Sequence, residues 1–241
     1  MPNDYFQFQQ FRIDQSQCAM KVSTDACLLG ATADLAGATR LLDIGTGTGL
    51  LALMAAQRQP NVKIEAVEID AAAAAQAAAN VAASPWAGRI RVRALSLAAY
   101  AATQPAAFSH IVSNPPFFRQ SLRSPNAGRT MARHEAANTL SFEALVEFTA
   151  RFLSSDGRLT VLLPPPEMHV FEAIAAAAQL YPATRLVVRH RPGSRPLRHI
   201  TGFGRVAGQL LATELTIRTA DDDSVYSADF RARLTGFYLA L

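Results

Sequence analysis

The feature of the sequence that most constrains the fold is a glycine-rich turn placed directly after a short apolar run. Residues 41–44 read Leu-Leu-Asp-Ile, and glycine follows at positions 45, 47 and 49. Because glycine has no Cβ and adopts positive φ readily, this spacing lets the backbone turn tightly and lets a ligand approach the main chain closely. A strand, such a turn and a helix in succession predict a parallel sheet with a ligand crevice at the carboxyl ends of its strands.

The rest of the chain alternates short apolar runs with longer alanine-rich or amphipathic stretches, which is typical of βα units. We predict strands over 40–44, 62–69, 90–94, 110–113, 158–163, 184–189 and 209–217. We predict helices over 24–35, 48–58, 71–83, 141–153, 167–180 and 228–238. A turn is expected over 154–157, and long connections are expected over 115–139 and 191–206. The predicted fold is α/β: one Rossmann-like domain with a seven-stranded, mostly parallel sheet and helices on both faces.

Length and composition set further limits. A chain of 241 residues, half of them hydrophobic, suits a single domain over 1–241 with a core over 39–241. The N-terminus lacks the basic start and apolar stretch of a secretory signal, and no run is apolar enough to span a bilayer. Cys18 and Cys27 stand nine residues apart without the spacing of a metal knuckle. These features favour a cytoplasmic protein with no membrane partner and no metal.

The basic residues are unevenly distributed, although the formal net charge is only +4. Of 23 basic residues only Lys21 and Lys63 are lysine, so 21 are arginine, whose planar guanidinium matches phosphate oxygens. Two stretches, 71–134 and 173–213, contain no carboxylate. Their arginines are Arg89, Arg91, Arg93, Arg119, Arg123, Arg129 and Arg133, and then Arg185, Arg189, Arg191, Arg195, Arg198 and Arg205. Unless acidic residues fold against these arginines, the two stretches form a positive surface that can bind a polyanion. The alternative interpretation is a basic face that is only solvated and binds nothing.

The residues after the next predicted strand indicate a nucleoside cofactor. Glu68 lies nineteen residues beyond Gly49, with Asp70 close behind, and an acid there can accept both hydroxyls of a ribose. NAD enzymes share this arrangement. Asp43 favours a different cofactor, because D-x-G-x-G-x-G is the pattern of class I methyltransferases, whereas dinucleotide folds usually carry G-x-G-x-x-G. The sequence therefore predicts S-adenosyl-L-methionine.

A second motif, Asn114-Pro115-Pro116-Phe117, follows the fourth predicted strand and should lie at the same crevice. An aromatic amine is a poor nucleophile unless acceptors hold its hydrogens and keep its nitrogen near-tetrahedral. The Asn114 side-chain carbonyl and the Pro115 main-chain carbonyl are two such acceptors, and the paired prolines stiffen the turn. Phe117 offers a flat face on which a planar base or amide can stack. Catalysis would then be mainly positioning, with no metal.

These motifs resemble the N-P-P-[YF] amino methyltransferases. The chain is similar to bacterial tRNA1(Val) (adenine-37-N6)-methyltransferases over roughly residues 6–217. The similarity is carried by the segment 18–31, by Ala-Arg-His-Glu at 132–135 and by Arg-Pro-Gly-Ser-Arg-Pro-Leu-Arg at 191–198. The resemblance implies methylation of an adenine beside the anticodon of a valine tRNA, with Lys21 and Thr24 near the cofactor or substrate entrance in an N-terminal segment over 1–38. Two residues depart from that family. Phe117 stands where tyrosine is usual, and Ser96 stands where many relatives have an acid for the cofactor adenine.

The expected site has three parts. The catalytic residues are Asn114, Pro115, Pro116 and Phe117. The cofactor-binding residues are Lys21, Thr24, Asp43, Gly45, Thr46, Gly47, Gly49, Glu68, Ile69, Ser96 and Asn114. The expected RNA-binding residues are Arg119, Arg129, Arg133, Arg191, Arg195 and Arg198, with Arg129 and Arg133 covering the site and holding phosphate while the target base turns outward.

Other functions use the same motifs. An rRNA guanine-N2 methyltransferase is favoured slightly by Phe117, and a protein glutamine-N5 methyltransferase would use the same acceptors but would not need the arginine stretches. A DNA adenine methyltransferase usually carries a separate target-recognition region, which this sequence lacks. A non-enzymatic RNA-binding module would have no need to keep Asp43, Gly45, Gly47, Glu68 and Asn114 together. The expected partner is therefore a tRNA, and a monomer is favoured.

Overall fold

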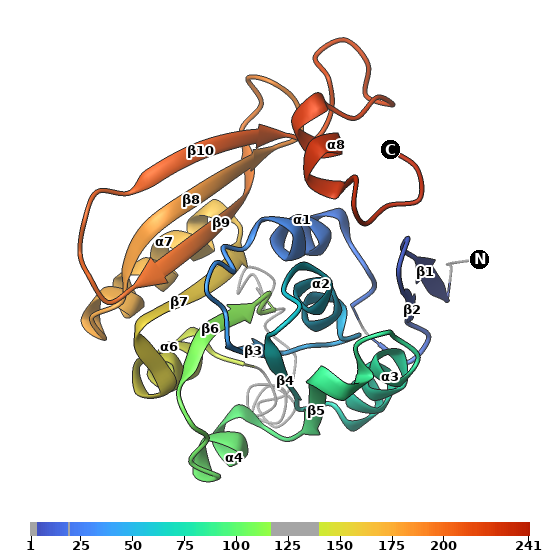
Figure 1. Cartoon of the computed structure of the whole chain (residues 1–241). Helices are drawn as coiled ribbons and strands as arrows, with labels where there is room; N and C mark the ends of the chain where they lie inside the picture. Colours follow the sequence, from blue (N-terminus) through green and yellow to red (C-terminus); the bar gives the residue numbers. More distant parts are fainter. Residues whose placement is uncertain (1–3, 19, 117–139) are drawn as a thin grey trace, which may run out of the picture.

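The computed structural model describes residues 4–18, 20–116 and 140–241, and these form an eight-stranded sheet with helices on both faces and a separate two-stranded hairpin (Figure 1). The strands are β1 (Tyr5–Gln7), β2 (Arg12–Asp14), β3 (Arg40–Ile44), β4 (Lys63–Glu68), β5 (Ile90–Ala94), β6 (Phe108–Ser113), β7 (Leu153–Leu163), β8 (Tyr181–Arg189), β9 (Pro196–Gly204) and β10 (Leu211–Thr216). The helices are α1 (Thr24–Thr32), α2 (Leu50–Arg58), α3 (Ala71–Ala82), α4 (Leu97–Ala102), α6 (Phe142–Phe152), α7 (Pro165–Ala177) and α8 (Ala228–Leu234), with a 3₁₀ turn at Ala87–Arg89.

The predicted α/β class and the mostly parallel sheet are confirmed. The large sheet has the order β10-β8-β9-β7-β6-β3-β4-β5, and every pairing in it is parallel except the two that β9 makes with β7 and β8. Parallel strands bring their carboxyl ends to one edge. Ile44 pairs with both Val67 and Ser113, so the residues that follow β3, β4 and β6 emerge side by side.

Two sequence predictions are wrong. Residues 191–206 are not one long connection, because β9 occupies most of them and adds an eighth strand to the seven expected. Its sequence, Pro-Leu-Arg-His-Ile-Thr-Gly-Phe-Gly, has a proline and two glycines, which are poor strand formers, and pairing on both sides buries Ile200 and Phe203. The turn expected over 154–157 is instead a bulge within β7, where the register with β6 passes from Leu153↔Phe108 to Arg158↔His110.

Two hydrophobic clusters cover the two faces of the sheet. Side chains of α1, α2 and α8 pack with Leu41, Ile64 and Val112 on one face. On the opposite face, α6 and α7 pack with Leu42, Ile111 and Val161. The alternation of faces along β3 and β6 follows from the period of two in a strand. Within the described ranges, no helix has the length and apolar character needed to cross a membrane.

The C-terminal segment holds the N-terminal hairpin against this core. The Gln9 main-chain N–H donates to Phe237 O at 2.8 Å, and the Gln9 side chain donates to Thr235 O and Tyr238 O at 2.8 and 2.6 Å. Phe8 pairs with Tyr238 in an isolated bridge. The N-terminal segment therefore enters the fold through contacts more than 220 residues away in the sequence.

Candidate active site

The glycine turn between β3 and α2 has the conformation that its sequence requires. Gly45, Gly47 and Gly49 all have positive φ, at 70°, 54° and 83°. The N–H groups of Gly45 and Thr46 both donate to Val67 O, at 2.9 and 3.1 Å, which fastens the turn to the end of β4. A Cβ on Gly47 would meet nothing within 4 Å, so the main chain here is open to a ligand. A Cβ on Gly49 would lie 3.5 Å from Ala77 Cβ of α3, so the turn and this helix lie close together here.

Asp43 lies fully buried beneath this turn. Its Oδ2 accepts from Thr46 Oγ1 at 2.6 Å and from the Ala52 N–H at 3.2 Å, so the carboxylate braces the turn and the first turn of α2. Its Oδ1 is buried without a hydrogen-bond partner among the described residues. Burial raises the pKa of Asp43 to about 7, although the bonds from Thr46 and Ala52 oppose that shift. The unsatisfied oxygen is a strong acceptor available to a ligand.

Glu68 ends β4 next to the glycine turn. Its Oε2 accepts from the Gly47 N–H at 2.9 Å and its Oε1 accepts from the Asp70 N–H at 3.0 Å. A carboxylate has about four lone-pair sites, so both oxygens keep acceptor capacity for hydroxyl groups. The side chain of Asp70 is engaged differently, because it caps α3 by accepting from the Ala73 N–H at 2.8 Å.

The two strands at this side of the sheet end in exposed aliphatic residues. Ile69 follows β4 with 45% of its surface exposed, and Leu95 follows β5 with 36% exposed. Glu68 pairs with Ala94, so these two residues follow directly on neighbouring strands. Ser96 stands beside them and caps α4, with its Oγ accepting from the Ala99 N–H at 3.1 Å. Leu95 was missed in the sequence, because a single leucine in a loop carries no signal until its strand is placed.

Asn114 follows β6 at the same edge. Ser113 donates from Oγ to Ile44 O at 2.9 Å and so ties the end of β6 to the end of β3, where the glycine turn begins. Asn114 Oδ1 is buried and has no hydrogen-bond partner within the described residues. Pro115 is buried and Pro116 is half-buried. Phe117, Arg119, Arg129 and Arg133 lie outside the described residues.

The N-terminal segment passes over the glycine turn. Asn80 of α3 is buried, and its side chain bonds both to the main chain of Asp14 and to Thr48 O in the turn. Burial raises the pKa of the Cys18 thiol, and the charges of Glu68 and Asp70 raise it further, so this cysteine lies within electrostatic range of the two acids. No pattern around Asn80 in the sequence distinguishes it from other residues of an alanine-rich helix.

The two predicted entrance residues occupy different surroundings. Burial raises the pKa of the Tyr238 hydroxyl, Cys27 raises it further and a hydrogen bond with Thr24 opposes the shift, so Thr24 lies next to the C-terminal segment. Lys21 is exposed, and its Nζ lies 4.0 Å from Asp4 Oδ1.

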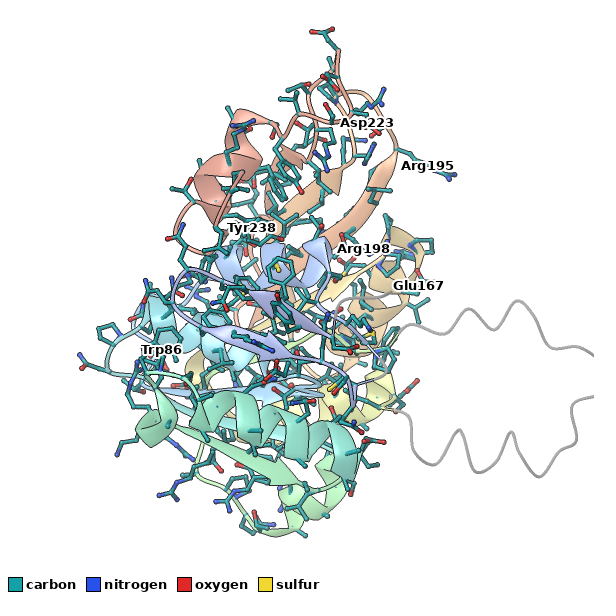
Figure 2. The ribbon with its side chains drawn as sticks, turned by 90° about the vertical axis from the view of Figure 1, so that its right-hand side faces the viewer. Trp86, Glu167, Arg195, Arg198, Asp223 and Tyr238 are labelled. Carbon is teal, nitrogen blue, oxygen red and sulfur yellow. The ribbon has the colours of Figure 1, made fainter. Side chains whose placement is uncertain are left out.

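Most arginines of the second acid-free stretch have acids folded against them. Arg185 pairs with Glu172, Arg189 with Glu214, Arg191 with Asp223 and Arg198 with Asp25. The positive surface expected over this stretch is therefore largely neutralised, because acids distant in sequence return to it. Arg195 differs, since its side chain is exposed and extends from the β8–β9 loop into solvent (Figure 2).

Comparisons with known proteins agree with this geometry. The family described as Methyltransferase small domain matches residues 18–166. The tRNA1(Val) (adenine(37)-N6)-methyltransferase of Phocaeicola vulgatus is 42% identical over 239 residues, covering 99% of each chain. The protein of the same name from Pseudoalteromonas translucida is 40% identical over 236 residues, covering 98% of this chain and 99% of its own. The chain belongs to the tRNA1(Val) (adenine(37)-N6)-methyltransferase family.

Solved structures support the fold of this family member. A predicted O-methyltransferase from Agrobacterium tumefaciens has a TM-score of 0.63 at 20% identity, covering 88% of this chain and 96% of its own. The ribosomal protein L11 methylase from Lactobacillus delbrueckii subsp. bulgaricus has a TM-score of 0.55 at 17% identity, covering 81% and 84%. Both show the class I methyltransferase fold.

The methyl donor of this methyltransferase is S-adenosyl-L-methionine. The residues at the carboxyl edge fit that cofactor. Asp43 and Asn114 each hold a buried, unsatisfied acceptor oxygen, and the cofactor carries N–H donors. Gly47 leaves the main chain uncovered, Glu68 keeps free lone pairs, and Ile69 offers an exposed aliphatic surface to a ring.

Proposed function

We propose that this enzyme transfers a methyl group to the exocyclic N6 amine of an adenine in tRNA, at the position named for its relatives, adenine 37 of tRNA1(Val). The observation that carries the proposal is the unsatisfied Oδ1 of Asn114, which lies at the end of β6 beside the strand that leads into the glycine turn. An amine placed there would have a hydrogen-bond acceptor and would lie next to the methyl donor.

The proposed cofactor contacts follow from the surroundings of each residue. Asp43 and the main chain at Gly45, Thr46 and Gly47 would hold the amino acid part, with Gly49 allowing the close approach of α3. Glu68 would accept the ribose hydroxyls, and Ile69 would pack against the adenine ring. We also assign Ser96, Lys21 and Thr24 to the cofactor site, at its outer side. When bound, the cofactor supplies a sulfonium methyl group.

The proposed catalytic residues act by positioning. The carbonyl oxygens of Asn114 and Pro115 would accept hydrogen bonds from the two N–H groups of the adenine amine. These bonds would withdraw the nitrogen lone pair from the ring and direct it at the methyl group. Phe117 would stack on the base, and Pro116 would fix the turn. The methylated amine can release its proton to water, so we assign no general base.

The β8–β9 loop carries the proposed RNA contact among the described residues. It lies at the same edge as Asn114, since β8 ends there and β9 starts there. The order β6-β7-β9-β8 separates them by three strand spacings, or about 14 Å. An anticodon stem beside the loop could contact Arg195, while Arg191 and Arg198 would first have to exchange their acid partners for phosphate. Arg119, Arg129 and Arg133 are proposed to hold phosphate next to the target base.

We also propose that the chain works as one domain over 1–241 and as a monomer in the cytoplasm, where its tRNA substrate is modified. The segment 1–38 would form the substrate and cofactor entrance, and 39–241 would form the catalytic core.

Transfer of labelled methyl to total tRNA from a strain lacking this gene tests the proposed function. We expect N6-methyladenosine from the wild-type enzyme and a loss of at least about 100-fold in rate for Asn114→Ala, since positioning groups contribute on that scale. Asn61→Ala is the matched control, because Asn61 is exposed in the turn before β4, at the opposite edge. Label found on rRNA guanine or on a protein glutamine, and absent from tRNA, would refute the substrate and leave the methyltransferase chemistry intact.

A further inference from the structure

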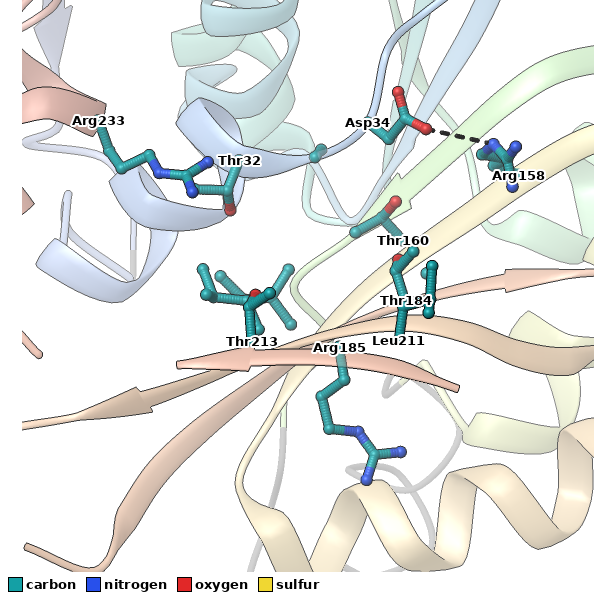
Figure 3. Close-up of a pocket in the computed structure, with 13 residues that line it drawn as sticks. Thr32, Asp34, Arg158, Thr160, Thr184, Arg185, Leu211, Thr213 and Arg233 are labelled. Carbon is teal, nitrogen blue, oxygen red and sulfur yellow. Dashed lines mark ion pairs between the residues drawn. The ribbon is translucent and has the colours of Figure 1, made fainter. Parts of the chain in front are cut away.

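A cavity lies at the amino edge of the sheet, opposite the proposed cofactor residues. Its volume is about 230 Å³, and it lies between one face of the strands β7 to β10 and the ends of α1 and α8 (Figure 3). This volume is below the roughly 300–1,000 Å³ of pockets for drug-sized ligands, so it suits a molecule about as large as a sugar phosphate. The cavity shares no residue with the site described above.

The floor of the cavity is lined by hydroxyl groups. Thr160, Gly202, Thr184 and Leu211 form one row across the sheet, because each pairs with the next. Thr213 lies in the next row of the same face, beside Leu186 and Ile200. Within the described part of the chain, the hydroxyls of Thr160, Thr184 and Thr213 have no hydrogen-bond partner. Figure 3 shows them on the side of the sheet that faces Thr32 and Asp34.

Gly202 keeps this floor open. A Cβ at position 202 would lie 2.6 Å from Thr184 Oγ1, so any larger residue would displace the threonine or cover its hydroxyl. Further toward the carboxyl edge, the same face becomes aliphatic, with Leu186, Val188 and Ile200 buried against α1. The polar row is therefore confined to the cavity.

The rim of the cavity carries two arginines. Arg158 forms an ion pair with Asp34, at 3.3 Å between Nε and Oδ2. Arg233 extends from α8 toward Thr32, and among the described residues it has no ion-pair or hydrogen-bond partner (Figure 3). Arg185 also borders the cavity, but its side chain points to the opposite face and pairs with Glu172. The excess charge at the opening is therefore positive, and it comes from a guanidinium whose planar donors suit an oxyanion.

We propose that this cavity binds a phosphate monoester that carries hydroxyl groups. Arg233, with Arg158 beside it, would hold the phosphate at the rim, and the hydroxyls of Thr160, Thr184 and Thr213 would bond to the hydroxyls of the ligand on the floor. The same chemistry occurs in a free sugar phosphate and in the ribose with a terminal 5′-phosphate at the end of an RNA strand. The proposal does not depend on which base the enzyme methylates.

Calorimetric titration of the intact protein with ribose 5-phosphate tests the proposal, with S-adenosylhomocysteine present at saturation to block the cofactor site. We expect ribose 5-phosphate to bind and ribose to bind at least about tenfold more weakly, because the charge-assisted bonds are missing. Arg233→Gln should weaken binding of ribose 5-phosphate about tenfold or more, and Thr160→Val, of similar shape without the hydroxyl, should also weaken it. Arg91→Gln is the charge-matched control, since Arg91 is exposed on β5 at the far side of the sheet.

Absence of binding at about 10 mM ribose 5-phosphate, or equal affinity in the wild type, Arg233→Gln and Thr160→Val, would overturn the proposal. The source of the phosphate is decided by tRNA binding. If the RNA supplies it, ribose 5-phosphate should compete with tRNA and Arg233→Gln should bind tRNA more weakly than Arg91→Gln does. If a free metabolite supplies it, ribose 5-phosphate should bind without affecting tRNA affinity.

Discussion

Asn80 and Asp14 exchange two hydrogen bonds across 66 residues of sequence. The Asp14 N–H donates to Asn80 Oδ1 and Asn80 Nδ2 donates to Asp14 O, each at 2.9 Å. The same Nδ2 donates to Thr48 O in the glycine turn, also at 2.9 Å. One buried side chain of α3 therefore joins the end of the N-terminal hairpin to the turn that we assign to the cofactor.

Replacing Asn80 by alanine should destabilise the protein. The change leaves one buried main-chain group, Thr48 O, and two partly buried ones, the N–H and O of Asp14, without their partners. A fully buried group left unpaired costs about 1–3 kcal/mol and a partly buried one less, so we expect the free energy of unfolding to fall by roughly 2–4 kcal/mol. Urea denaturation measures this fall. The exposed Asn61→Ala should change the free energy of unfolding by less than about 0.5 kcal/mol. Equal free energies of unfolding for the two variants would show that the hydrogen bonds of Asn80 do not stabilise the protein.

The raised pKa of Asp43 predicts that stability depends on pH. The pKa is about 7 in the folded protein and 3.8 as the ordinary value, so between these values the folded state binds more protons than the unfolded state. The contribution of this group to stability is then fully present below pH 3.8 and is lost as pH rises through 7. The free energy of unfolding falls by at most about 1.4 kcal/mol per pH unit because of this group.

Urea denaturation between pH 5 and pH 8 checks this expectation, with Asp43→Asn as the comparison. The asparagine remains neutral throughout, so the variant should lack the part of the slope that Asp43 contributes. Parallel pH profiles for the two proteins would mean that Asp43 is already ionised in the folded state at pH 5.

Gly47 should be required for cofactor binding and not only for the turn. Alanine at φ 54° costs about 1–2 kcal/mol of backbone strain, and its Cβ would enter the open space at the main chain. We expect Gly47→Ala to weaken S-adenosylhomocysteine binding at least about tenfold, which corresponds to about 1.4 kcal/mol.

Gly37→Ala is the matched control for this change. Gly37 has φ 71° and equally open surroundings, but it lies in the turn before β3, away from the carboxyl edge. Both variants should lose similar stability, and only Gly47→Ala should lose affinity. If both bind S-adenosylhomocysteine as the wild type does, the main chain at Gly47 does not contact the cofactor.

Arg195 should contribute one phosphate contact to tRNA binding. Its side chain is exposed on the β8–β9 loop, so Arg195→Gln should leave the fold unchanged. We expect weaker tRNA binding and a decrease of about 0.7–0.9 in the slope of log affinity against log salt concentration, as expected for the loss of one neutralised phosphate. Titrations at several salt concentrations measure both, with Arg91→Gln as the control. An unchanged salt slope would place the RNA on another surface.

The sequence by itself determined the parts of this protein that depend on neighbours along the chain. The bounds of β3 and β5 were predicted to the residue, and the glycine turn has the positive φ angles that its spacing requires. Asn114 lies beside that turn, as expected, because the carboxyl ends of parallel strands always meet at one edge.

Only the tertiary structure decided what depends on residues far apart in the chain. Pairing with β7 and β8 made a strand of the segment Pro196–Gly204. Asp25 and Asp223 form ion pairs with Arg198 and Arg191 and reduce the positive charge expected there. The Asn80–Asp14 link and the hydroxyl-lined cavity arise in the same way. Propensity and periodicity report the backbone preferences of a short window, whereas pairing partners, neutralising charges and cavities are fixed by which elements pack together.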